Sequence, residues 1–175
     1  MKILVVSRQF VERKIQVCPD WCAGKWIISI FSHFDINLKY SPCPDRYNIL
    51  KLQFDDVTEK DNVGIKFSEN HAKKLLDFIK AIKSDSDMPF YIHCDAGVSH
   101  SGAVGYMLNE WFNKYIETNR EDNEFFIQNN RHIMPNPLVV RILKNEFFGN
   151  DYSGVFVNDY TYNENGEQID NITEV

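Results

Sequence analysis

The sequence predicts an α/β domain in which helices pack against a central mixed, largely parallel sheet of four or five strands. Short apolar segments with strand character alternate along the chain with longer segments of helical periodicity. With 175 residues and 43% hydrophobic content, the chain can close one core, so we expect a single three-layer domain. We place this domain at residues 1–150 and interpret 151–175 as an acidic, polar, partly flexible extension.

Four segments have strand character, at residues 3–6, 26–30, 49–54 and 90–93. The third alternates apolar and polar side chains, whereas the first and last are continuous apolar runs of the kind buried on both faces of a sheet. Because helices separate the strands along the chain, most neighbouring strands should be parallel.

Three helices have clear boundary signals. Ser68 can cap a helix whose apolar positions keep helical spacing, and a second, almost wholly apolar helix begins near Ser101. The last is indicated by Asn136 as cap, Pro137 at the first position and Gly149 as terminator. We also expect a helix at 119–129, a short edge strand at 155–157 and a mobile stretch from about residue 161.

Charge and composition exclude several classes of partner. The net charge of −6 argues against binding to nucleic-acid polymers or anionic membranes, which need a basic surface. The apolar run at residues 3–6 is too short for a signal peptide or a membrane span. We therefore expect a cytoplasmic protein, a monomer, whose ligands are selected by a local pocket.

Four cysteines stand at positions 18, 22, 43 and 94. This density is low for a disulfide-stapled secreted domain and suits a reducing compartment, so ordinary semi-buried thiols are expected. A zinc site from Cys18, Cys22 and Cys43 with His33 is the alternative, but the spacing lacks paired C-x-x-C knuckles. We expect no metal and no other cofactor.

The segment FYIHCDAGVSHSGAV, residues 90–104, contains the strongest functional signal. It runs from a predicted strand through Cys94 and a small-residue loop into a helix. Helix amino termini lower the pKa of cysteine thiols, and convergent backbone N–H groups can hold an anion. The candidate phosphate-binding residues are Asp95, Ala96, Gly97, Val98, Ser99 and His100.

Further candidates surround this loop. The Ser101 hydroxyl could stabilise the departing sulfur, or only cap the helix. His93 could orient the loop by hydrogen bonding, or be an ordinary core residue. A general acid is also needed, and Asp55 and Asp56 end the third strand before a polar segment that could close over a pocket. Either aspartate could equally belong to a solvated turn.

These residues resemble the motif of the cysteine-dependent protein tyrosine phosphatases, closest to the small dual-specificity type and to short bacterial or phage proteins. The family pattern is H-C-x(5)-R-S/T, matched here by His93, Cys94, Gly97 and Ser101. The resemblance covers about residues 1–148. It implies phosphomonoester hydrolysis through a phosphocysteine at Cys94 without a metal, with Asp56 preferred as general acid and Asp55 as the alternative.

His100 departs from the pattern because it stands at the arginine position. Histidine lacks the planar fork and permanent charge that bind a phosphoryl group, and losing such a donor costs about 10²–10³ in rate. The chain is thus either a naturally weakened member or one altered at this position. A protonated His100 predicts residual activity that rises from pH 7 to 5.5.

The motif and its departure at His100 are consistent with two functions. The first is a phosphatase of the tyrosine or dual-specificity type, impaired by His100. The alternative is a weak or inactive pseudophosphatase that binds a phosphorylated protein or a small phosphorylated metabolite.

Overall fold

The computed structural model describes residues 1–33, 42–43, 48–82, 88–115, 120–149, 161–162 and 168–169. Four strands form one sheet in the order β1-β4-β2-β3. Every neighbouring pair in it is parallel, so the predicted α/β fold is confirmed and the sheet, expected to be mixed and largely parallel, is wholly parallel. The strands are β1 (Ile3–Ser7), β2 (Trp26–Phe31), β3 (Ile49–Gln53) and β4 (Phe90–Cys94).

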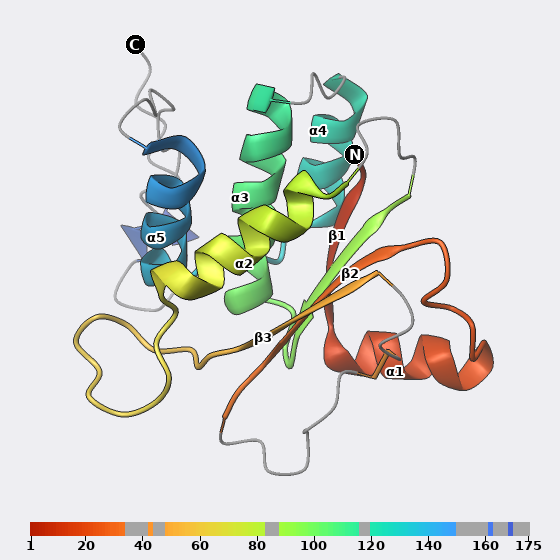
Figure 1. The fold of residues 1–175 in the computed structure, drawn as a ribbon, viewed down its shortest axis with the longest axis horizontal. Coiled ribbons are helices and arrows are strands. Elements are labelled where there is room, and N and C mark those ends of the chain that lie inside the picture. Colours follow the sequence, from red (N-terminus) through yellow and green to blue (C-terminus); the bar gives the residue numbers. More distant parts are fainter. Residues whose placement is uncertain are drawn as a thin grey trace.

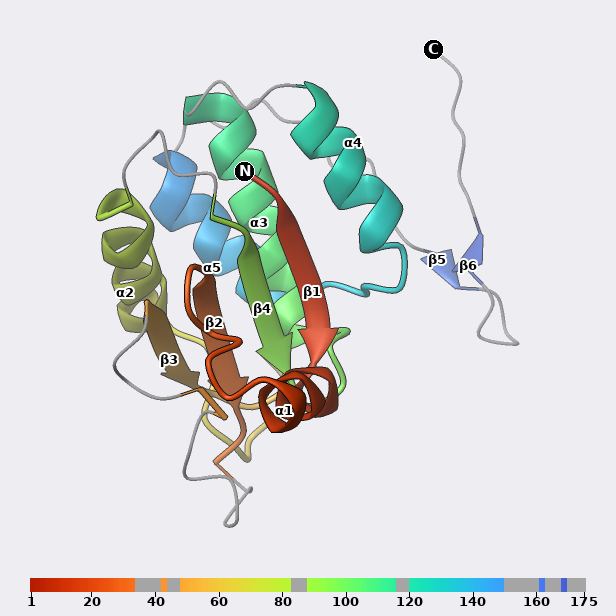
Figure 2. The ribbon, with the colours of Figure 1, turned by 90° about the vertical axis from the view of Figure 1, so that its right-hand side faces the viewer.

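Helices cover both faces of this sheet, as the two ribbon views show (Figures 1 and 2). One face carries α2, α3, α4 and α5, and α1 lies on the other, at the carboxyl end of the strands (Figure 2). The helices are α1 (Arg8–Val17), α2 (Glu69–Lys80), α3 (His100–Tyr115), α4 (Arg120–Asn129) and α5 (Pro137–Phe148). The expected three-layer arrangement is therefore present.

Alternating side chains along the strands separate two hydrophobic clusters. In β4, Phe90, Ile92 and Cys94 join the large cluster under α2 to α5, whereas Tyr91 packs against the small cluster under α1. This alternation follows from the two-residue period of a strand. It determines that Cys94 faces the same side of the sheet as α3.

Most helix boundaries agree with the sequence signals. Asn136 accepts hydrogen bonds from the Leu138 and Val139 N–H groups at the start of α5, and Pro137 is the first helical residue. The helices predicted after Ser68, near Ser101 and at 119–129 are also present.

Helix α1 was not predicted from the sequence. Its only fully buried residue is Val11, so the apolar stripe is too narrow to stand out among the charged positions. The signal that could have revealed it is Ser7, whose hydroxyl accepts a hydrogen bond from the Phe10 N–H at 3.2 Å.

The outer edge of β1 is closed by a side chain. Asn130 is 2% exposed and accepts the Val5 N–H at 2.7 Å, while its amide donates to the Ile3 carbonyl at 3.0 Å. A buried edge strand would otherwise leave backbone groups unpaired. Strand β1 is thereby fixed beside β4, where the candidate site begins.

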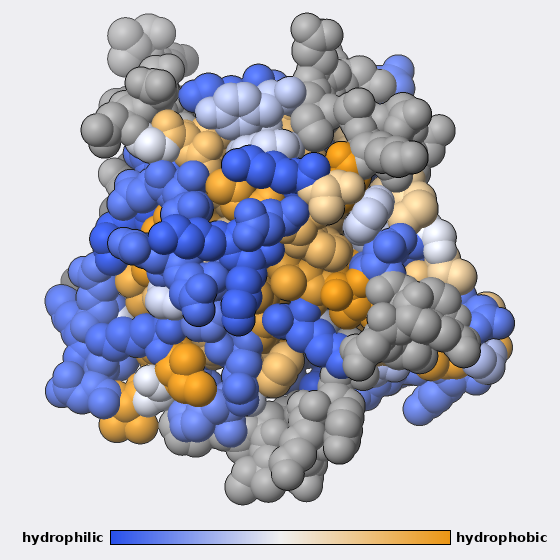
Figure 3. Space-filling view, viewed as in Figure 1, coloured by the Kyte–Doolittle hydropathy of each residue, from blue (hydrophilic) through white to orange (hydrophobic). Residues whose placement is uncertain are grey.

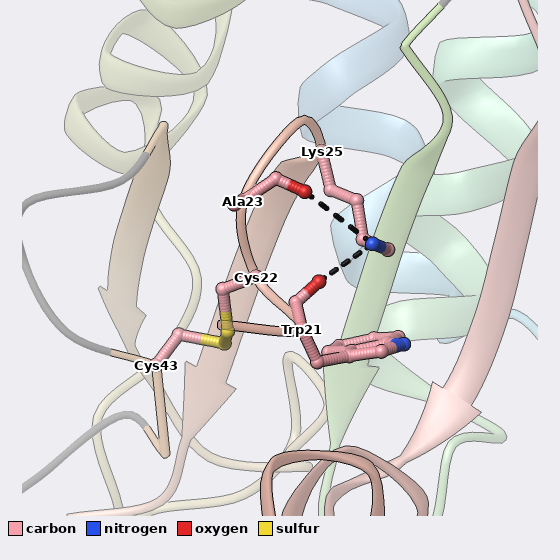
Figure 4. The surroundings of a disulfide bond; sticks show 5 residues. All are labelled: Trp21, Cys22, Ala23, Lys25 and Cys43. Atoms are coloured by element: carbon pink, nitrogen blue, oxygen red, sulfur yellow. Dashed lines mark hydrogen bonds between the residues drawn. A yellow bond between two sulfur atoms is a disulfide. The ribbon is translucent and has the colours of Figure 1, made fainter. Parts of the chain in front are cut away.

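A disulfide joins Cys22 to Cys43, and Figure 4 shows it beside Trp21. The expectation that these two residues are ordinary thiols was wrong, and the bond also removes them as zinc ligands. Both cysteines are buried in the small cluster under α1, so burial brought them together across 21 residues of sequence. Cys18 and Cys94 are free. The cysteine count is therefore no longer a reason to expect a reducing compartment.

On the face seen in Figure 3, polar side chains dominate the half that carries α2 and α5, and apolar ones form a band beside them.

Among the described residues, none of the helices is both apolar and long enough to cross a bilayer. The same part of the chain contains no group of three or more His, Cys, Asp or Glu placed to hold a metal ion.

Short strands β5 (Thr161–Tyr162) and β6 (Gln168–Ile169) pair antiparallel with each other in the carboxyl-terminal segment. The predicted edge strand at 155–157 lies outside the described residues, as does most of the segment from residue 161 onward.

Candidate active site

The site is built where β4 ends and α3 begins. Cys94 is the last residue of β4 and pairs with Ser7, the last residue of β1. The loop from Asp95 to Ser99 then turns back, and α3 starts at His100. The cysteine thus lies at the carboxyl edge of a parallel sheet and before a helix amino terminus, where helix dipoles favour anions.

Gly97 is required by the shape of this loop. Its φ of +79° lies in the left-handed region, and a Cβ atom there would lie 2.5 Å from the Ser7 nitrogen and from the Val6 carbonyl carbon. No side chain fits against backbone at that distance. The close approach turns the Gly97 N–H toward the Cys94 sulfur, at 3.3 Å.

The Cys94 sulfur is buried among hydrogen-bond donors. The thiol is 4% exposed, and its Sγ lies 3.1 Å from the Ser101 hydroxyl. Burial alone raises the pKa of this thiol, but the His100 side chain, the Ser101 hydroxyl and the N–H groups of Ser101 and Gly97 lower the pKa to about 7. A substantial fraction of Cys94 is therefore thiolate at neutral pH.

His100 lies between the cysteine and the acid loop. Its ring packs edge-on against Phe54, with the centroids 4.9 Å apart, and its Nε2 is 3.6 Å from Asp56 Oδ1. Burial lowers its pKa, but contact with Cys94, the charges of Asp56 and Cys94, and the Asp55 carbonyl raise the pKa above its ordinary value overall. The surroundings thus favour an imidazolium beside a thiolate.

Asp55 and Asp56 have opposite environments. Asp55 is 4% exposed and accepts hydrogen bonds from the Ser32 hydroxyl, from the His33 N–H at 3.0 Å and from the Ile65 N–H at 2.5 Å. Its Oδ2 also lies within hydrogen-bonding distance of the His33 ring nitrogen Nδ1. Burial raises the pKa of Asp55, but these hydrogen bonds lower it overall, so Asp55 is a fixed carboxylate that braces the loop.

Asp56 instead points toward the cysteine loop. Its side chain is 52% exposed, and its Oδ1 accepts hydrogen bonds from the Ser99 hydroxyl at 2.7 Å and from the Asn136 amide at 2.8 Å. The sequence indicated Asn136 only as a helix cap. Its contact with Asp56 was not predicted. The one available signal is that the side-chain amide of a capping asparagine keeps two N–H donors after its oxygen has capped the helix.

His93 is enclosed rather than hydrogen-bonded to the loop. It is 1% exposed, and within the described residues neither ring nitrogen has a hydrogen-bond partner. Burial and the nearby Arg8 charge lower the pKa of His93 to about 4, so the ring is neutral. Because side chains alternate along β4, His93 faces the side of the sheet opposite to Cys94.

The remaining loop residues are held through their main chain. The Asp95 carbonyl accepts the Arg8 N–H at 3.2 Å, and the Val98 carbonyl accepts the Met134 N–H at 3.1 Å. The side chains of Asp95 and Ala96 are exposed at the mouth of the loop. Segments from α1 and from the approach to α5 therefore clamp the loop on two sides.

No protein-family model matches the chain, and no curated protein matches its sequence. Among solved structures, the PTP-2 phosphatase of Cydia pomonella superposes with a TM-score of 0.53 at 17% identity, over 83% of this chain and 85% of that one.

Two human structures superpose less closely. DUSP28 has a TM-score of 0.48 at 13% identity, over 82% of this chain and 90% of that one. The tyrosine phosphatase-like serine/threonine/tyrosine-interacting protein has a TM-score of 0.47 at 19% identity, over 76% and 82%. The Cydia pomonella likeness is one of fold: the chain has a protein tyrosine phosphatase-like α/β fold, with Cys94 at the carboxyl edge of its parallel sheet.

Proposed function

We propose that the chain is a cysteine-dependent phosphomonoester hydrolase of the tyrosine or dual-specificity type, weakened by His100. The observation that supports this most is the setting of Cys94, a thiol with a pKa of about 7 at a helix amino terminus, with the Gly97 N–H 3.3 Å from its sulfur. Thiolate and phosphate are stabilised there by the same donors.

In the first step of the proposed reaction, the Cys94 thiolate attacks phosphorus and the bond from phosphorus to the ester oxygen breaks. Asp56, in its protonated form, gives its proton to that oxygen as it leaves. Asp56 suits this role because it is exposed and faces the loop, whereas Asp55 is buried and committed to four contacts. The products are an alcohol or phenol and a phosphocysteine.

In the second step, water attacks the phosphocysteine and the sulfur–phosphorus bond breaks. The Asp56 carboxylate takes the proton of the water, and inorganic phosphate leaves. The Ser101 hydroxyl, 3.1 Å from Sγ, donates a hydrogen bond to the returning thiolate. No metal or cofactor takes part in this scheme.

His100 determines how well the reaction runs and at which pH. The imidazolium must supply the positive charge that balances the phosphoryl oxygens, so acidity helps. The sequence predicts that activity rises as the pH falls from 7 to 5.5. The Cys94 pKa of about 7 limits this rise in activity, because the thiol regains its proton over the same range. We expect a maximum near neutral pH, where thiolate and imidazolium coexist.

A second candidate is a module that binds a phosphorylated protein or small metabolite without turning it over. The observation in its favour is His100, which cannot grip two phosphate oxygens as an arginine fork does. The loop amides and the helix dipole would still attract the phosphate group.

An aryl phosphate assay separates the two candidates. The variants are Cys94→Ser, His100→Arg and, as a control that makes the same substitution at an exposed histidine outside the site, His132→Arg. For the hydrolase, His100→Arg raises kcat about 10²-fold or more, Cys94→Ser abolishes turnover, and His132→Arg changes little. If arginine gives no gain while phosphopeptides or phosphorylated metabolites still bind, the binding module is the better account.

A further inference from the structure

Asn136 joins three parts of the site through its side chain and its main chain. Its Oδ1 caps α5 by accepting the N–H groups of Leu138 and Val139 at 3.0 and 3.2 Å. Its Nδ2 donates to Asp56 Oδ1 at 2.8 Å and to the Val57 carbonyl at 3.4 Å. Its own N–H donates to the Ser99 carbonyl of the phosphate loop at 3.3 Å. The residue is 4% exposed, so this geometry is fixed by packing.

The contacts of Asp56 are divided unequally between its two oxygens. Asn136, Ser99 and His100 all approach Oδ1, at 2.8, 2.7 and 3.6 Å. Within the described residues, Oδ2 of Asp56 makes no hydrogen bond. Oδ1 is therefore held in place, and Oδ2 is not engaged by any of these contacts.

Apart from Asp55, the contacts that tie the acid loop to the rest of the protein near Asp56 are exposed ones, among them the ion pair between Glu59 and Arg141 of α5. Residues 58–64 after Val57 are exposed, and the buried carboxylate of Asp55 anchors the loop on its inner side. The direction in which Asp56 points therefore depends mainly on the hydrogen bonds from Ser99 and Asn136, of which Asn136 is the more buried donor.

We propose that Asn136 is a positioning residue whose amide latches Asp56 over the phosphate loop and so directs Oδ2 toward the leaving oxygen. The proposal deepens the proposed hydrolase and rests on it. Because the latch also grips the Val57 carbonyl, it should hold the start of the acid loop whether or not turnover occurs.

The test must separate the latch from the helix cap. Asn136→Asp and Asn136→Ser both keep an oxygen that caps α5, since Asp, Asn and Ser are comparable caps. Asp loses the amide donors and places a second carboxylate beside Asp56, while Ser is too short to reach it. Asn129→Asp, at an exposed asparagine whose amide donates to the Phe125 carbonyl, is the control for the added charge.

The first readout is hydrogen exchange of the Val57 amide, which is bonded to the Asp55 carbonyl at 2.9 Å. In Asn136→Asp and Asn136→Ser this amide should exchange about tenfold faster at unchanged thermal stability, and in Asn129→Asp at the native rate. Unchanged exchange in both Asn136 variants would overturn the latch.

The second readout is the choice of leaving group, measured at pH 7.5 in the native chain and with His100→Arg. Asn136→Asp should slow an unactivated aryl phosphate about tenfold and leave an activated dinitrophenyl phosphate within about twofold, because only the former needs protonation. Equal slowing of both substrates would overturn the positioning role. If no variant turns over, including His100→Arg, the failure lies in the proposed function, and hydrogen exchange still decides the latch.

Discussion

Replacing Gly97 by alanine tests whether the phosphate loop is formed as described. The substitution places a Cβ 2.5 Å from two backbone atoms of β1, at a φ of +79°. Left-handed backbone costs about 1–2 kcal/mol for a residue with a side chain, and overpacking costs about 1–3 kcal/mol. We therefore expect Gly97→Ala to lower the free energy of unfolding by about 2–5 kcal/mol.

Gly24→Ala is the matched control, because Gly24 also has a positive φ, of +64°, but its Cβ would meet nothing within 4 Å. It should lose only the backbone part, about 1–2 kcal/mol. Urea unfolding followed by fluorescence measures both. Losses equal within about 0.5 kcal/mol, below the overpacking range, would refute the close contact between the loop and β1.

Three further expectations concern the acid loop and the disulfide. Asp55→Ala should destabilise the fold by about 2–4 kcal/mol in thermal unfolding, since it leaves several buried donors without an acceptor, whereas Asp56→Ala, at a side chain that is 52% exposed, should cost about 1 kcal/mol for the hydrogen bonds from Ser99 and Asn136; equal losses would contradict the two roles. Because Asp55 has a lowered pKa, its contribution is present above the ordinary value of 3.8 and is lost as the pH falls below it, so acid titration of Asp55→Asn should lack part of the native transition. Reducing the bond between Cys22 and Cys43, which closes a separation of 21 residues, should cost about 3 kcal/mol, and a Cys22→Ser, Cys43→Ser double variant should be insensitive to reductant.

Much of the fold could be predicted because its signals are local. Continuous apolar runs indicated β1 and β4, and the cap and terminator of α5 stand within a few residues of the helix they bound. Helix α1 was not predicted because one buried side chain, Val11, makes no periodic pattern. The disulfide was not predicted because pairing of Cys22 with Cys43 depends on a tertiary contact across the small cluster under α1.

In the candidate site, too, features with local sequence signals could be predicted and those that depend on tertiary contacts could not. Cys94, Gly97 and Ser101 lie within eight positions of one another, so a single segment contains them. The division of labour between Asp55 and Asp56 could not be read from adjacent identical residues, because it depends on partners such as Ser32 and Ile65 that the fold brings together.

The contact between Asn136 and Asp56 could not be predicted for the same reason. Asn136 stands 80 residues from Asp56 in sequence, and capping fully explained it on local grounds. His93 shows the opposite case, since its position beside the cysteine suggested a hydrogen bond to the loop, whereas its ring nitrogens have no partner among the described residues.

The ionisation of Cys94 tests the central claim most directly. In a Cys18→Ser background, which leaves Cys94 as the free thiol, the rate of alkylation by iodoacetamide is followed against pH with and without inorganic phosphate. We expect a midpoint at about 7 and protection by phosphate, because thiolate and anion share the same donors. A midpoint near the ordinary cysteine value of 9.0, with no effect of phosphate, would contradict an anion-binding cradle at Cys94.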